Sequence, residues 1–177
     1  MPITFTVTTC SLPVAGDVCF NVVNTSNNAT YYVTAQPIYV WPGTSPYPII
    51  GQAGIQTVLS VRDPQEVILP LTPVDLTEVS QLISSNVAFT NVPLPHIAMT
   101  QDQFNQQAYK AATVINDWPN PLLVHCSTGD RASAAFAAFL ITYCGYNNDA
   151  ALAFAIQKLA LQNQQFMAWL QVYQPPS

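Results

Sequence analysis

The residues best suited to covalent chemistry are Cys126 and Arg131, which stand five positions apart in the segment His125–Arg131. A cysteine thiolate is a strong nucleophile, and an arginine guanidinium can hold two oxygens of a phosphate or sulfate at once. The small residues between the two, including Gly129, allow successive backbone amides to turn inward. The segment therefore predicts an anion-binding loop that contains a nucleophilic sulfur.

The sequence on either side of this loop predicts the elements that position it. Leu122–His125 is a short apolar run after two prolines, which is typical of a buried strand. The small-residue segment 132–143, followed by Gly145, predicts a helix whose positive end faces the loop. Amides, helix dipole and Arg131 would all favour the charged form of a thiol placed there. The alternative is that Cys126 is a small core residue and Arg131 a surface charge.

Strands and helices alternate along the chain from residue 54 onward. The sequence predicts strands over 54–61, 87–94 and 122–125, with helices between and after them, the last over about 148–172. Such alternation predicts an α/β fold with three layers, a mostly parallel central sheet and helices on both faces. We expect a single domain over 1–177, with a β-rich segment over 1–35 and the α/β core over about 30–172. The proline-rich segment 37–50 is interpreted as a surface loop, and Thr72 with Pro73 as a helix start.

Composition excludes several classes of function. Only 7% of residues are charged, the net charge is −5, and the four basic residues are scattered, so neither nucleic acid nor an anionic membrane is an expected partner. No apolar run is long enough to predict a membrane-spanning helix. Cysteine spacing without C-x-x-C, together with only two histidines, does not predict a metal site. Cys10 and Cys19 are either bridged in an oxidising compartment or thiols in a cytoplasm, so the compartment stays open.

The loop pattern His-Cys-x-x-Gly-x-Arg resembles the signature loop of the protein tyrosine and dual-specificity phosphatases. The likeness is closest to the bacterial phosphatase-like domain named after the beta-lactamase hydrolase-like protein. Tyr32–Pro37 is similar to the opening of that domain, Ala53–Arg62 to its first central strand and Asn91–Pro95 to the strand before its acid loop. The resemblance covers about residues 30–172 and implies a cysteine-phosphatase-like fold.

The resemblance also implies a mechanism and its residues. The Cys126 thiolate would attack a phosphomonoester of a protein or small molecule, forming a cysteinyl-phosphate that water hydrolyses without a cofactor. Asp102 is the candidate general acid, with His96 and Asp63 as alternatives. His125 would support the loop. The residues expected to bind the substrate are His125, Ser127, Thr128, Gly129 and Asp130.

Three features depart from the phosphatase pattern. The loop is one residue shorter than in most tyrosine phosphatases, Asp130 adds a carboxylate that would repel a dianion if it faced the pocket, and Ala132 replaces the usual hydroxyl residue. Because Cys-x-x-Gly-x-Arg is also the rhodanese pattern, the rival enzyme is a sulfurtransferase that carries a persulfide on Cys126. A third alternative is a domain that only binds a partner. The oligomeric state is left open.

Overall fold

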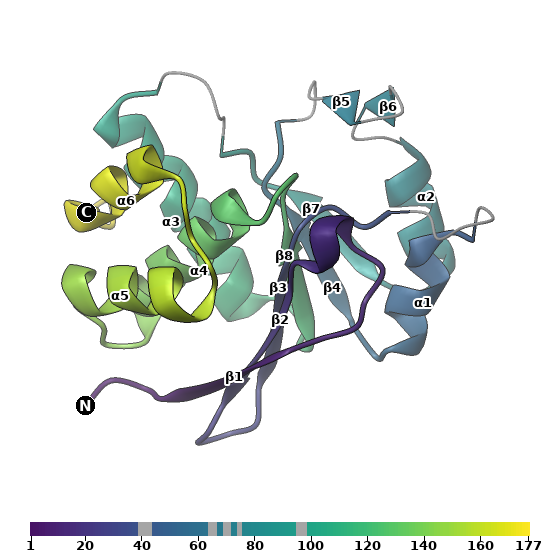
Figure 1. Ribbon diagram of the computed structural model, residues 1–177, viewed down its shortest axis with the longest axis horizontal. Helices are drawn as coiled ribbons and strands as arrows, with labels where there is room; N and C mark the ends of the chain where they lie inside the picture. Colours follow the sequence, from purple (N-terminus) through teal and green to yellow (C-terminus); the bar gives the residue numbers. More distant parts are fainter. Residues whose placement is uncertain (39–43, 64–66, 69–71, 74–75, 95–98) are drawn as a thin grey trace.

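The computed structural model describes residues 1–38, 44–63, 67–68, 72–73, 76–94 and 99–177. Within these residues a central sheet lies between two layers of helices (Figure 1). Its strands are β1 (Phe5–Thr9), β2 (Cys19–Asn24), β3 (Thr30–Thr34), β4 (Thr57–Ser60), β7 (Ala88–Asn91) and β8 (Leu122–His125). The helices are α1 (Pro46–Gln52), α2 (Leu76–Ser84), α3 (Gln101–Asp117), α4 (Asp130–Tyr143), α5 (Asn148–Lys158) and α6 (Gln164–Gln171), with a short η1 (Ala15–Asp17) and a separate pair β5 (Val67–Ile68) and β6 (Thr72–Pro73).

The order of strands in the central sheet is β1-β2-β3-β8-β4-β7, and β3, β8, β4 and β7 run parallel. Thr34 pairs with His125, His125 with Ser60 and Ser60 with Asn91, so the carboxyl ends of these strands reach one edge of the sheet together. Every residue of β4 and β8 is buried, as expected for parallel strands covered on both faces. This edge is where an α/β sheet places its ligands.

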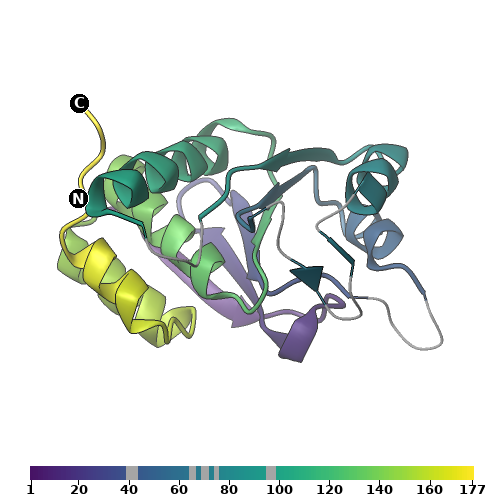
Figure 2. The same ribbon diagram turned by 90° about the horizontal axis from the view of Figure 1, so that it is seen from above.

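The two helical layers bury different faces of the sheet (Figure 2). Helices α1 and α2 pack on one face around Ile50, Leu82 and Leu123. Helices α3 to α6 pack on the other face, where the core includes Leu122 and Val124 of β8. Successive residues of β8 thus enter opposite cores, as a pleated strand requires. The predicted α/β fold with a mostly parallel sheet and helices on both faces is confirmed.

Helix α4 is enclosed by the rest of the molecule, since every residue from Arg131 to Leu140 is buried. Its alanines permit close approach of the sheet and of α3. Helix α3 begins with a capping box: Thr100 Oγ1 accepts the Gln103 amide at 3.2 Å, and Gln103 Oε1 accepts the Thr100 amide at 2.9 Å. Among the described residues, no helix combines the length and apolar character needed to cross a membrane.

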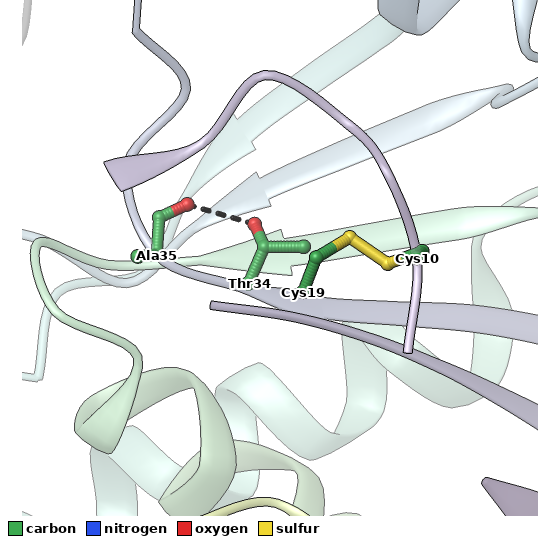
Figure 3. Close-up of a disulfide and its surroundings, with 4 residues drawn as sticks. All are labelled: Cys10, Cys19, Thr34 and Ala35. Carbon is green, nitrogen blue, oxygen red and sulfur yellow. Dashed lines mark hydrogen bonds between the residues drawn. A yellow bond between two sulfur atoms is a disulfide. The ribbon is translucent and has the colours of Figure 1, made fainter. Parts of the chain in front are cut away.

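The predicted N-terminal strands belong to the same sheet as the α/β core, because β1 and β2 add to it as antiparallel strands next to β3. Cys10 and Cys19 form a disulfide, with their Cα atoms 5.1 Å apart (Figure 3). The sequence alone had left this pairing open. The bridge closes a segment that lies against the end of β3, where the Ala35 amide donates to the Val18 carbonyl at 3.0 Å.

Three predictions about individual elements are wrong. Part of the expected loop over 37–50 is helical, because Ser45 caps α1 and its prolines occupy the first turn, where no intrahelical amide bond is lost; residues 39–43 lie outside the described residues. Thr72 and Pro73 form a strand, so α2 begins later, at Leu76. The single helix expected over 148–172 is divided into α5 and α6 where Ala160 has a φ of 56°.

Candidate functional site

The strand order delivers the predicted nucleophile to the carboxyl edge of the sheet. Cys126 is the first residue after β8, and the following loop leads into α4. Its side chain is 0% exposed, whereas Thr128 at the middle of the loop is exposed to solvent. The loop therefore runs from the core, where the sulfur lies, to the surface.

Three successive carbonyl oxygens at the start of the loop have hydrogen-bond partners, two of them amides from outside the loop. The His125 carbonyl accepts the Val61 amide at 2.9 Å, and the Ser127 carbonyl accepts the Gln36 amide at 3.1 Å. Between them, the Cys126 carbonyl lies 3.4 Å from Nδ1 of His125. The backbone orientation is thus fixed from the sheet side and from the residues that follow β3.

These contacts decide where the loop amides point. In a trans peptide the N–H lies opposite the carbonyl oxygen, so amides that follow outward-held carbonyls turn to the other side. Among the described residues, no partner is found for the amides of Ser127, Thr128 and Asp130. They are unused donors at the positive end of α4 and are suited to an anion.

The sulfur lies on the side of these donors. The Gly129 amide donates to Cys126 Sγ at 3.0 Å. A backbone N–H aimed at sulfur, together with the helix dipole, stabilises negative charge there. The Cys126 sulfur, the Gly129 amide and the start of α4 therefore lie together, and anion binding by this loop stays a prediction.

Gly129 makes this geometry accessible. Its φ is 107°, a conformation that L side chains rarely adopt, and it caps the start of α4. A Cβ at this position would lie 2.9 Å from Cγ1 of Val18, next to the disulfide residue Cys19. Any other residue would strain the loop and clash with the segment closed by the disulfide.

Arg131 turns toward the interior, and only 6% of it is exposed. Its Nη1 donates to the Leu94 carbonyl at 3.4 Å, just beyond β7. Leu94 is held in turn by its amide, which donates to the Val61 carbonyl at 2.9 Å. The alternative in which Arg131 is a surface charge does not agree with this burial.

Two buried charged residues near the loop were not predicted from the sequence. Glu78 of α2 lies 2.7 Å from His125, between Oε1 and Nε2. Arg62 is 0% exposed and its Nη1 donates to Gln36 Oε1 at 2.8 Å. One signal in the sequence could have indicated that Glu78 is buried. It precedes Leu82 by four residues and therefore lies on the apolar face of its helix.

No protein-family model and no curated protein matches the sequence. The kinase associated phosphatase with a serine in place of its catalytic-site cysteine has a TM-score of 0.62 at 12% identity, covering 96% of this chain and 93% of that chain. The core catalytic domain of PP-IP phosphatase SIW14 from S. cerevisiae has a TM-score of 0.59 at 11% identity, covering 81% and 80%. P. aeruginosa TpbA, in complex with pTyr, has a TM-score of 0.54 at 16% identity, covering 81% and 76%.

The chain has the tyrosine and dual-specificity phosphatase fold. The predicted resemblance to this superfamily is thereby confirmed at the level of fold. The closer likeness to one bacterial phosphatase-like domain stays a prediction.

Within this phosphatase fold, the carboxylate of Asp130 is already engaged. Its Oδ1 accepts the amide of Gln162, in the connection between α5 and α6, at 2.8 Å. The hydroxyl of Ser133 likewise serves the scaffold, since it donates to the carbonyls of Gly129 and Leu159. Ala132 therefore leaves the position after the arginine without a hydroxyl, and Ser133 does not replace it.

The structure shows no hydrogen bond between a candidate general acid and Cys126 among the described residues. Asp102 is exposed in the first turn of α3, where an acid is stabilised by the helix dipole. Asp63 is half-buried after β4. His96 lies outside the described residues. The described residues contain no group of three or more His, Cys, Asp or Glu side chains that could hold a metal.

Proposed function

We propose that the chain is a cysteine-dependent phosphomonoesterase. The observation that carries this proposal is the hydrogen bond from the Gly129 amide to Cys126 Sγ, in a loop where the amides of Ser127, Thr128 and Asp130 have no partner among the described residues. The phosphatase fold supports the same assignment. Because TpbA was solved with pTyr, we propose aryl phosphates as the substrate class to test first.

The proposed reaction has two displacements at phosphorus. The Cys126 thiolate forms the S–P bond while the ester P–O bond breaks, and an acid protonates the departing oxygen. Water then attacks phosphorus, the S–P bond breaks, and inorganic phosphate is released. Loop amides and the Arg131 guanidinium stabilise the equatorial oxygens in both steps.

The rival proposals make different use of the same loop. A sulfurtransferase would carry a persulfide on Cys126 and need no acid. A domain that only binds a partner was suggested by Asp130, but the bond from Gln162 to its carboxylate weakens that argument. The fold comparisons favour the phosphatase over the sulfurtransferase.

The substrate assay separates these alternatives. The protein should release phosphate from p-nitrophenyl phosphate and from phosphotyrosine, and should form no thiocyanate from thiosulfate and cyanide. Mass spectrometry of protein quenched in acid during turnover should find a phosphate group on Cys126. Thiocyanate formation without phosphate release would identify the protein as a sulfurtransferase. Absence of both activities would support the alternative of a domain that only binds a partner.

Two observations favour His96 over Asp102 as the proposed acid. Arg131 contacts the Leu94 carbonyl, and His96 follows Leu94 by two residues in the chain. Asp102 instead neighbours Gln101, whose Nε2 donates to the Trp169 carbonyl at 3.0 Å. Trp169 lies within α6, whereas Gln162, the partner of Asp130, lies in the connection before that helix.

We therefore expect His96→Asn to slow hydrolysis more than Asp102→Asn does. An acid matters most when the departing oxygen is a poor leaving group, so the loss with phenyl phosphate should be about 100-fold or more and clearly smaller with p-nitrophenyl phosphate. Steady-state kinetics on both substrates measure the ratio. A larger loss of activity in Asp102→Asn than in His96→Asn would instead favour Asp102 as the general acid.

A further inference from the structure

A buried pair of ionisable side chains, Glu78 and His125, lies next to the proposed nucleophile. Glu78 and His125 are 1% and 0% exposed, and 2.7 Å separates Oε1 from Nε2. Glu78 comes from α2, on the face of the sheet opposite α4, and His125 ends β8. Burying two such groups is costly unless they pair, and the pairing alone does not explain their place behind the loop.

The other ring nitrogen of His125 connects this pair to the loop. Nδ1 lies 3.4 Å from the Cys126 carbonyl oxygen, which can only accept a hydrogen bond. Nδ1 must therefore carry the hydrogen. The 2.7 Å contact between Nε2 and Glu78 Oε1 requires another proton, carried by one of these two atoms. Glu78 thus fixes the orientation of the ring.

The Cys126 carbonyl and the Ser127 amide are parts of one peptide group. A donor at the carbonyl polarises that peptide and strengthens its N–H as a donor. The Ser127 N–H has no partner among the described residues and lies opposite the held carbonyl, on the anion-binding side. One continuous chain of polar groups therefore runs from the Glu78 carboxylate to the anion site.

We propose that Glu78 is a positioning residue that acts through His125 on the Cys126–Ser127 peptide, orienting its N–H toward the transferred phosphoryl group. This inference rests on the proposed phosphatase function. Because the loop amides matter most when charge builds up on the phosphoryl oxygens, loss of the Glu78 charge lowers kcat more than it raises KM.

The kinetic test is a double-mutant cycle of Glu78→Gln and His125→Asn on p-nitrophenyl phosphate. Glu78→Gln, which preserves side-chain size, should lower kcat/KM about 10-fold, mainly through kcat. Because the proposal places the effect of Glu78 on the ring, the double variant should be no slower than His125→Asn alone. Losses that multiply, or a loss confined to KM, would overturn the proposal. Ser80→Ala, an exposed change on the same helix, is the matched control.

A second measurement does not depend on catalysis. The chain has two histidines, so ¹⁵N-histidine labelling with His96→Asn as reference assigns the ring nitrogens of His125. In the protein without substitutions, we expect Nδ1 of His125 to carry a proton. The tautomer with the proton on Nε2 alone would refute the inference even if the protein proved a phosphatase. If the protein proved not to be a phosphatase, the NMR result would still stand and only the kinetic role would fall.

Discussion

Cys126→Ser should reduce aryl phosphate hydrolysis by about 10⁴-fold or more, because a serine hydroxyl without an adjacent base is a poor nucleophile. The substitution is small, and the Gly129 amide that now reaches sulfur can donate to the serine oxygen. The fold and the loop amides should therefore persist. Turnover measured beside an unchanged thermal unfolding curve checks this prediction.

Cys144→Ala is the matched control for this experiment. Cys144 is the other free cysteine among the described residues, and it is also buried. Burial raises the pKa of Cys144 to about 12, so at neutral pH it stays a neutral thiol. Cys144 lines a cavity of about 250 Å³ together with Tyr31 and Asn120. Tyr31 is near the start of β3 and Asn120 precedes β8, so this cavity lies at the edge of the sheet opposite Cys126. Removing it should leave turnover intact, whereas a fully active serine variant would exclude Cys126 as the nucleophile.

Arg131→Ala should reduce kcat/KM by about 10²–10³-fold, because it removes the only guanidinium predicted to hold the equatorial oxygens. Arg131→Lys should recover little, since an ammonium group lacks the two parallel donors of the fork. Inorganic phosphate, measured as a competitive inhibitor, should bind more weakly to both variants.

The contact from Arg131 to the Leu94 carbonyl means that part of any loss could come from the scaffold. Thermal unfolding of the variants separates the two effects, and Lys110→Ala provides a control cation on the exposed side of α3. Near-normal activity of Arg131→Ala would show that the amides alone suffice for the anion.

Local chemistry explains which parts of the structure followed from the sequence. Leu122–His125 was predicted with its observed bounds, since a continuous apolar run between prolines and a polar loop is compatible with few structures. The capping box of Thr100 and Gln103 likewise depends only on residues close in sequence, and this pattern favours the start of a helix. The loop was recognisable as a candidate anion-binding loop because its sulfur, glycine and arginine are close in sequence.

The remaining features depend on contacts between distant residues. The division between α5 and α6 needs a positive φ at Ala160, a residue whose type gives no warning of it. Glu78 becomes a partner of His125 only once α2 packs over β8, and 47 residues separate the two. The orientation of the Asp130 carboxylate similarly depends on the α5–α6 connection. Pairings of this kind have no short-range pattern.

The bridge between Cys10 and Cys19 sets a practical constraint on any study of this protein. Strong dithiol reductants, commonly added to protect a reactive thiol such as Cys126, attack disulfides by exchange. Opening the bridge would release the segment that places Val18 against Gly129. Buffers chosen to keep Cys126 reduced can therefore break the Cys10–Cys19 disulfide that supports the loop. Free thiols should be counted before every assay.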